Sequence, residues 1–503
     1  MHLKKLFGSP ARLAWFSAIG LATFQACAST EEIPDDDEFG GGPRRDGGTT
    51  VSSSSSSGGT SGGGASSGGP QALDIVQLSS LVNHTCAVWN DGMLKCWGMN
   101  PYGALGQGDT EDRGDDPGEM GDNLPPIDVG SNRKVRRVAT GYFFTCALLD
   151  DATVKCWGDN PICGPQNDEN CGIGYGDTLA RGSTPGTMGD ALPALDLGAS
   201  AKDISCGTFG CCALLVDDSI KCWGENIDGV LGYGDELTRG NAPGQMGANL
   251  PPVDVGVSGV STIKMGNTLI VRHTCAALKD GNLKCWGNNT YGQLGLGDTA
   301  SRGDDLNEMG TALPEVLAGN FVSDVSPGNN ATCALTAEGQ VRCWGDNTYG
   351  QLGYGDTLTR GRVGGQNFPI LDLGGKATNI GLSQHACAVL ESGVVKCWGV
   401  NEFPGFGDAG ASPSGRLGYG DTLTRGNAPG QMGVNLPPVD LGRTAAPVQV
   451  ALGSAHTCVR FVGGKVKCFG ENFRGALGIG DEETRGDAAS DMGDNLPFVD
   501  LGR

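Results

Sequence analysis

The sequence predicts an all-β protein built from seven copies of one repeat. Seven pairs of cysteines stand ten residues apart, and the second cysteine of each pair recurs after 54 to 71 residues. The 503 residues include 87 glycines and eight tryptophans, and few apolar runs have helical spacing, which is typical of short strands joined by tight turns. Because a fixed internal period takes precedence over length as a guide to domain number, we expect one repeat architecture.

The charge of the chain excludes several classes of partner. Its formal net charge is -22 at pH 7 and its isoelectric point is near 4.5. Nucleic-acid affinity comes largely from clustered Lys and Arg side chains. We therefore expect no nucleic-acid partner, and contact with a membrane only through a lipid anchor.

Residues 1–27 have the parts of a bacterial secretory signal. A basic start precedes the apolar stretch 13–24, which is too short to cross a bilayer comfortably. Cys27 resembles the lipid-modified cysteine of lipoproteins, although Ala26-Cys27-Ala28 also fits an ordinary cleavage site. We expect a lipoprotein-type signal with lipidation at Cys27 and a place in the bacterial cell envelope, as an outer-membrane lipoprotein; free secretion is the alternative.

A change of composition separates this signal from the repeats. Residues 28–70 are rich in Gly and Ser and contain almost nothing that could bury apolar surface, so we expect a disordered tether. The repeats then occupy residues 71–503, and we expect them to form a monomer.

The cysteine spacing is explained by a stapled hairpin. In the first unit, Asp91-Gly92 suits a type I turn followed by a residue with positive φ. A three-residue loop centred on Asp91 places Cys86 directly opposite Cys96, within reach of a disulfide. Free core cysteines and a zinc site are the alternatives, and paired cysteines in an exported chain favour oxidation.

The remaining cysteines fit two further bridges and one lipid site. Cys163 and Cys171 bracket an insertion, and Cys206 can pair with Cys211, although Cys212 competes with Cys211. The predicted disulfides are Cys86–Cys96, Cys146–Cys156, Cys163–Cys171, Cys206–Cys211, Cys212–Cys222, Cys275–Cys285, Cys333–Cys343, Cys387–Cys397 and Cys458–Cys468.

Each unit contains a first apolar strand, the stapled hairpin ending in C-W-G, the motif N-x-x-G-x-L-G-x-G-D, and a final P-x-V-D-L-G. Four strand candidates in about 60 residues fit one propeller blade. The segment GNNATCALTAEGQVRCWGDNTYGQLGYGDT, residues 328–357, resembles the repeat of the regulator of chromosome condensation family. That resemblance implies a seven-bladed β-propeller over residues 71–503, with the C-W-G tryptophans packed between blades.

Two features of the chain depart from the repeat of that family. The staple cysteines look like those of an exported bacterial branch, and Phe469 replaces the tryptophan found in the other units. We expect the ring to close by pairing a strand near Ile75 to Leu78 with residues 498–502 in one blade, which would remove exposed sheet edges.

An aspartate and an arginine four residues later recur in every unit, which predicts a charge-assisted clip that orders the same loop seven times. Calcium binding by these loops is the alternative, but no unit has the ligand density of a known calcium loop. We therefore expect no cofactor. The pairs are Asp109 and Arg113, Asp177 and Arg181, Asp235 and Arg239, Asp298 and Arg302, Asp356 and Arg360, Asp421 and Arg425, and Asp481 and Arg485.

Two insertions interrupt the repeat, at 161–171 and 402–416, and both follow W-G-x-N. Loops on a rigid scaffold often form binding sites, so we expect ligand contacts there. Trp89 has no tryptophan at its position in the other units, and an exposed aromatic there would also suit binding. The candidate ligand-contacting residues of the insertions are Pro161, Asn167, Glu169, Glu402, Phe403, Phe406 and Arg416.

These observations favour a non-enzymatic binding scaffold, anchored in the envelope or secreted, that recognises an unknown protein or glycan through blade loops. Exchange of guanine nucleotide on a small GTPase, the activity of the family's eukaryotic founder, is the alternative that the resemblance implies. Hydrolase or lyase chemistry in the channel is disfavoured, because residues repeated in every unit are poor candidates for an asymmetric active site.

Overall fold

The second of two compact units of the chain contains every residue whose placement is described. The units are Met1–Ala72 and Leu73–Arg503, so the predicted signal, Cys27 and the tether lie outside the described residues. No helix in the described ranges has the length and apolar character needed to span a membrane. The computed structural model describes residues 73–160, 173–256, 259–266, 272–364, 368–403 and 412–502.

The described unit contains seven three-stranded antiparallel sheets, one per repeat, so the all-β prediction is confirmed. The first strands are β1 (Ile75–Leu81), β4 (Val135–Thr140), β7 (Ala201–Cys206), β10 (Val260–Met265), β13 (Val322–Pro327), β16 (Ala377–Leu382) and β21 (Pro447–Leu452). The second strands are β2 (His84–Trp89), β5 (Phe144–Leu149), β8 (Gly210–Leu215), β11 (His273–Leu278), β14 (Ala331–Thr336), β17 (His385–Leu390) and β22 (His456–Phe461). The third strands are β3 (Leu94–Gly98), β6 (Val154–Gly158), β9 (Ile220–Gly224), β12 (Leu283–Gly287), β15 (Val341–Gly345), β18 (Val395–Gly399) and β23 (Val466–Gly470).

Short elements complete the described chain. A two-stranded ribbon, β19 (Glu402–Phe403) and β20 (Ser412–Pro413), begins and ends the second insertion. Nine single-turn 3₁₀ helices lie in the described loops: η1 (Gly121–Asn123), η2 (Gly189–Ala191), η3 (Ile227–Gly229), η4 (Gly247–Asn249), η5 (Gly310–Ala312), η6 (Gly433–Asn435), η7 (Phe473–Gly475), η8 (Ala489–Asp491) and η9 (Gly493–Asn495).

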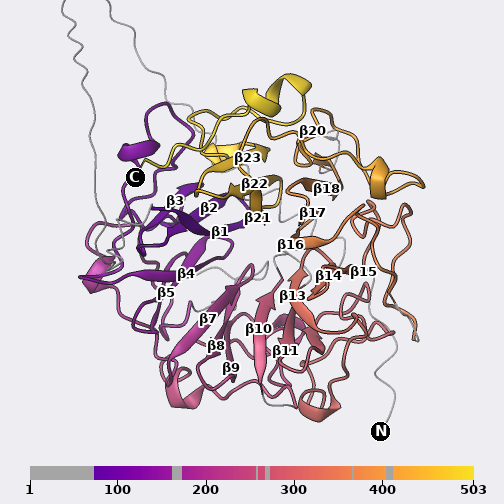
Figure 1. Ribbon diagram of the computed structural model, residues 1–503. Helices are drawn as coiled ribbons and strands as arrows, with labels where there is room; N and C mark the ends of the chain where they lie inside the picture. The colour runs from indigo at the N-terminus through magenta and orange to yellow at the C-terminus, as the bar shows by residue number, and fades with distance from the viewer. Residues whose placement is uncertain are drawn as a thin grey trace, which may run out of the picture. The chain divides into compact units, whose positions relative to one another are not determined.

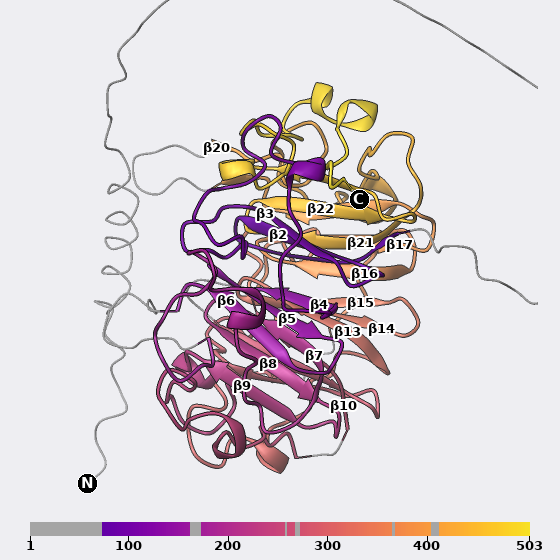
Figure 2. The same ribbon diagram turned by 90° about the vertical axis from the view of Figure 1, so that its left-hand side faces the viewer.

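The seven sheets form a closed ring. Each first strand contacts the first strand of the next sheet, and β21 contacts β1, so these strands surround a central axis (Figure 1). Turned by 90°, the ring shows neighbouring sheets stacked in layers, as β4 to β6 lie beside β7 to β9 (Figure 2). The arrangement is that of a seven-bladed propeller.

The hairpin register is the one predicted from the cysteine spacing. Cys86 lies opposite Cys96 in the β2–β3 pair, and Gly92 has the positive φ of +91° that the turn requires. Where a unit lacks this glycine, Ala152 and Asp218 adopt φ values of 67° and 70° at the same position. The turn geometry therefore persists in all seven units.

Eight of the nine predicted disulfides are formed in the described residues, while Cys163 and Cys171 lie outside them. Seven bridges join the second and third strands of their sheets with a separation of ten residues. Cys206 bonds Cys211 and Cys212 bonds Cys222, which settles the pairing that the sequence left open.

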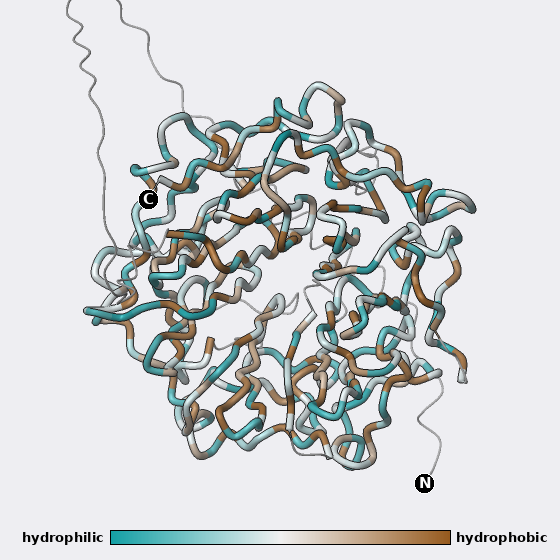
Figure 3. Tube along the Cα trace, in the orientation of Figure 1, coloured by the Kyte–Doolittle hydropathy of each residue, from teal (hydrophilic) through white to brown (hydrophobic). Residues whose placement is uncertain are grey.

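Apolar side chains pack between adjacent sheets. Trp157 of unit 2 is fully buried in a cluster with Leu105 and Ile127 of unit 1, and its indole nitrogen donates to the carbonyl of Ala104 at 3.0 Å. The other C-W-G tryptophans are buried as well, and hydrophobic segments follow the strands of the ring (Figure 3). The predicted packing of these tryptophans between blades is therefore confirmed.

The fourth strand predicted for each blade is wrong. In its place, P-x-V-D-L-G follows the third strand through one backbone hydrogen bond, such as Ile127 N to Leu94 O at 2.8 Å. Proline at 125 has no N–H to extend the pairing, and the Asp128 carboxylate accepts from the Gly130 amide at 2.9 Å, which turns the chain away. The segment makes the equivalent backbone bond in the other six units.

The predicted ring closure is wrong too. β1 pairs with β2 of its own repeat, and Val499 N donates to Val466 O of β23 at 2.9 Å, so each blade comes from one continuous repeat. The ring closes through contacts between blades: Lys95 Nζ donates to Leu501 O at 2.7 Å. A backbone bond from Gly121 N to Asp500 O at 2.8 Å joins the same two blades, so no strand needs to be shared.

Candidate ligand-binding face

A repeated backbone contact defines one end of the ring. In six of the seven units, the amide of the residue after C-W-G, or C-F-G in unit 7, donates to the carbonyl of the residue before the second strand, at 2.8 to 3.0 Å. We call the two positions the mouth ring. Its residues are Asn83 and Met99, Phe143 and Asp159, Phe209 and Glu225, Arg272 and Asn288, Asn330 and Asp346, Gln384 and Val400, and Ala455 and Glu471.

The mouth ring surrounds one end of a central channel. The first strands line a cavity of about 220 Å³ along the axis of the ring. The chain enters the mouth ring two or three residues after six of these strands end, and seven residues after the end of β10. Residues of the mouth ring are therefore brought together from all seven units, although they are far apart in sequence.

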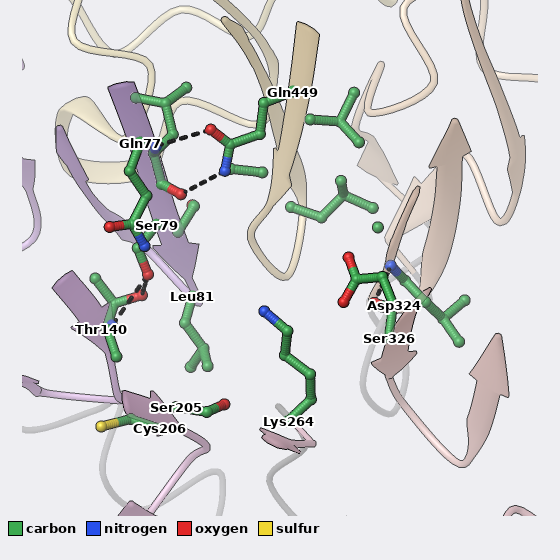
Figure 4. A pocket seen from close by; sticks show the side chains of 18 of the residues that line it. Gln77, Ser79, Leu81, Thr140, Ser205, Cys206, Lys264, Asp324, Ser326 and Gln449 are labelled. Atoms are coloured by element: carbon green, nitrogen blue, oxygen red, sulfur yellow. Dashed lines mark hydrogen bonds between the residues drawn. The ribbon is translucent and has the colours of Figure 1, made fainter. Parts of the chain in front are cut away.

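Most polar groups seen in the channel tie neighbouring blades together. The Gln449 amide donates to Leu78 O at 2.9 Å and accepts from Leu78 N at 3.0 Å, and Gln77 pairs with Val138 in the same way. Figure 4 shows the hydrogen bonds of Gln449, and shows Lys264 extending into the cavity. The amides satisfy backbone groups at the free edges of the first strands.

An aromatic row crosses the mouth ring from unit 1 to unit 3. The rings of Tyr102 and Phe143 lie 5.0 Å apart between centroids, those of Phe143 and Tyr142 3.9 Å, and those of Tyr142 and Phe209 5.7 Å. All four side chains are partly exposed, and burial raises the pKa of Tyr142. A contiguous, partly exposed aromatic surface is typical of an interaction site.

A buried ion pair continues the row into unit 4. Arg272 pairs with Glu225, and the two residues are only 7% and 3% exposed. The guanidinium carbon of Arg272 lies 4.5 Å from the ring centroid of Phe209, a cation–π geometry. Burial lowers the pKa of Arg272 to about 9.

Asp159 is a second buried carboxyl of the mouth ring. Its residue is 9% exposed, and its Oδ1 atom has no hydrogen-bond partner in the described part of the chain. Burial raises its pKa to about 6. A backbone hydrogen bond from Asn160 opposes this rise. No cation pairs with the carboxyl in the described ranges, whereas Glu225 is paired with Arg272, and a buried carboxylate without a paired charge is costly.

Arg416 is not the exposed loop residue that we predicted. It is fully buried, and its Nη1 donates to Gln384 Oε1 and to Ser454 O, both at 3.0 Å. The repeat explains this correction: Arg416 precedes Leu417 in the same motif position as Gln351 before Leu352, and Gln351 is also buried.

The other predicted contact residues have mixed outcomes. Glu402 is exposed at the start of β19, and Phe403 follows it in the same strand. Pro161, Asn167, Glu169 and Phe406 lie outside the described residues. Trp89 is 4% exposed in a hydrophobic cluster, so its predicted role as an exposed binding aromatic is wrong.

The seven Asp–Arg clips are formed, with 2.6 to 2.8 Å between Nη2 and the carboxylate. They fix each loop after C-W-G, as predicted. In the described ranges, the one close group of three side chains able to ligate a metal is Cys146, Cys206 and Cys211. All three sulfurs are in disulfides.

Sequence reasoning missed most of the mouth ring. The position between W-G and the next asparagine is Met, Asp, Glu, Asn, Asp, Val or Glu in successive units, whereas its neighbours are nearly constant. That variation was a usable signal. The other mouth-ring position is the residue before the second strand. It belongs to no constant motif, so only the backbone contact in the structure identifies it.

Comparisons with known proteins agree with this architecture. Models described as the regulator of chromosome condensation (RCC1) repeat match residues 135–164, 271–293, 322–351 and 448–476, and a second model of the same description matches residues 91–148. The ultraviolet-B receptor UVR8 of Arabidopsis thaliana is 26% identical over 82% of this chain and 80% of its own length. The E3 ubiquitin-protein ligase HERC2 of Homo sapiens is 30% identical over 53% of this chain, a match that spans 5% of HERC2.

Two solved structures show the same fold. Yeast RCC1 (Prp20), solved with Kap60, superposes with a TM-score of 0.54 at 18% identity and covers 76% of this chain and 78% of its own. Human WBSCR16 superposes with a TM-score of 0.53 at 20% identity, over 77% of this chain and 90% of its own. Segments of the chain thus match the regulator of chromosome condensation (RCC1) repeat, and the described residues form a ring of seven three-stranded sheets.

Proposed function

We propose that this propeller is a non-enzymatic binding scaffold that holds a protein or glycan ligand at the mouth ring. The observation that carries the proposal is the variation of the residue after W-G, while the tryptophan or phenylalanine, the glycine and the asparagine around it persist. Variable side chains at equivalent places on a rigid frame are the usual basis of a binding face.

Three further observations support this face. The aromatic row is partly exposed there. Both insertions begin directly after Asn160 and Asn401, which each follow a mouth-ring residue. Eight disulfides in the described residues suit an oxidising compartment. We therefore also propose export, with the lipid anchor at Cys27 or as a secreted protein.

The test is affinity capture with the oxidised full chain, from bacterial envelope and culture-medium fractions. In the matched variant, residues 161–171 and 402–415 are each replaced by the Thr-Tyr-Gly of unit 5, residues 348–350. We expect a component that the intact chain retains and the variant releases. A component held equally by both would show that the two insertions contribute nothing to the site, and no retained component would contradict the binding role.

A further inference from the structure

One carboxyl–aromatic pair of the mouth ring already holds a cation from the same chain. Glu225 and Phe209 are joined by the backbone bond of the ring, at 3.0 Å. Arg272, from the next unit, pairs with Glu225 and lies over the ring of Phe209. The molecule therefore shows what this pair binds, which is a guanidinium held by charge and by the face of a ring.

Unit 2 repeats the pair without the cation. The Asp159 amide donates to Phe143 O at 2.8 Å, so the carboxyl and the ring have the same backbone relationship as Glu225 and Phe209. The residue of the next unit that corresponds to Arg272 is Phe209, which adds a ring and no charge. Asp159 Oδ1 accordingly has no hydrogen-bond partner in the described ranges.

The other carboxyls of the mouth ring have partners within the chain. Asp346 accepts hydrogen bonds from Thr348 Oγ1 at 2.6 Å and from Gln351 Nε2 at 3.1 Å. Burial raises the pKa of Glu471, and the positive charge of Arg416 opposes this rise. Of the four carboxyls of the mouth ring, Asp159 alone has neither a paired charge nor a side-chain hydrogen bond in the described ranges.

The segments between residues 73 and 502 that lie outside the described ranges cannot supply the missing charge. Residues 161–172, 257–258, 267–271, 365–367 and 404–411 contain no Lys, Arg or His. A cation at Asp159 has to come from another part of the chain or from another molecule. The net charge of -22 favours a basic partner.

We propose that Asp159, Phe143, Tyr142 and Phe209 form a recognition site for an arginine side chain of a partner protein. The guanidinium pairs with the Asp159 carboxylate, and its stem and planar face lie against the aromatic row, as Arg272 lies against Phe209. This inference rests on the proposed function and specifies the chemistry of the ligand.

The direct test is titration of the full chain with the peptide acetyl-Gly-Arg-Gly-amide, followed by NMR shifts of the peptide. The comparison peptide contains citrulline, which has the shape of arginine without its charge. We expect the arginine peptide to bind more tightly, and Asp159→Asn to weaken it about tenfold, as the loss of a charge-assisted hydrogen bond implies. Equal binding of both peptides, or no effect of Asp159→Asn, would overturn the proposal.

Two matched variants make the test specific. Glu338→Gln removes one charge from an exposed turn between β14 and β15, outside the mouth ring, and should leave binding of the peptide unchanged; a similar loss there would show a general charge effect and overturn the site. Arg44→Ser together with Arg45→Ser removes cations of residues 28–70, and tighter peptide binding by that variant would assign the site to the chain's own arginines instead of a partner. If a captured component binds Asp159→Asn as well as the intact chain, this inference fails while the binding role stands.

Discussion

The guanidinium carbon of Arg360 lies 4.2 Å from the ring centroid of Tyr354. In this unit both terminal nitrogens of the arginine donate to Asp356, at 3.0 and 2.8 Å. The units with Tyr175, Tyr233 and Tyr419 have the same stacked and bidentate geometry. In the three other units this position is Gln107, Leu296 or Ile479. There the arginine donates to the aspartate through its Nη2 alone. The tyrosine therefore orients the guanidinium so that both of its terminal nitrogens donate to the aspartate.

Replacement of this tyrosine should weaken the clip of its own unit. Tyr354→Leu recreates Leu296 of unit 4 and should lower the free energy of unfolding by about 1 to 3 kcal/mol, because it removes the stacked ring and a hydroxyl that accepts from the Cys343 amide. Tyr354→Phe keeps the stacked ring and should lose only the part of the free energy of unfolding that the hydroxyl contributes. Urea denaturation measures both, and equal stability of the two variants and the native chain would contradict this role.

The buried ion pair should show strong coupling in a double-mutant cycle. Glu225→Gln alone should lower the free energy of unfolding by about 3 to 5 kcal/mol, because Arg272 is left charged and buried. Glu225→Leu combined with Arg272→Met should recover much of that loss. Denaturation of the single and double variants gives the coupling energy, and additive effects would show that the two side chains act independently.

Asp159 should destabilise the free protein at neutral pH. Its pKa of about 6 in the folded chain is raised by burial from 3.8, so the folded state binds more protons than the unfolded state between these two values. Asp159→Asn should therefore raise the free energy of unfolding by up to about 3 kcal/mol at pH 8. The gain should disappear as the pH falls through 6 toward 3.8, and a gain of equal size at pH 4 and pH 8 would contradict the burial penalty.

Each hairpin staple should contribute separately to stability. Removal of the Cys333–Cys343 bridge by a double alanine substitution should cost about 2 to 3 kcal/mol, because the unfolded chain regains the freedom of a ten-residue loop. Removal of a staple in a distant blade should add to this cost. Thermal unfolding in the oxidised state tests the prediction, and unchanged midpoints would show that blade packing alone holds the hairpin.

Features set by local chemistry could be predicted from the sequence. The spacing of Cys86 and Cys96 around Asp91-Gly92 determines the hairpin register by itself, and the Asp–Arg clips follow from two charges four residues apart. Repetition in every unit made these features visible. The closed ring and the packing of the tryptophans followed from the number of units and the family resemblance.

Features that depend on contacts between units could not be predicted. The ring closes through side chains such as Lys95, which reach the next blade, so the idea of a shared strand was wrong. Arg416 was assigned to an insertion although Gly415-Arg416-Leu417 fits the G-x-L of the motif, so the end of that insertion could have been predicted from the sequence. The pairing of Glu225 with Arg272 joins two units. Glu225 occupies the variable position of W-G-x-N, and Arg272 lies in no repeated motif.

Hydrogen–deuterium exchange of the full chain with and without its captured ligand shows directly whether the mouth ring binds that ligand. We expect slower exchange in the segments that contain the mouth ring, above all around Phe143, Asp159 and Phe209. The turns between the second and third strands, such as residues 90–92, lie at the other end of the hairpins and should exchange unchanged. Protection confined to those turns would place the ligand on the opposite face and contradict the account.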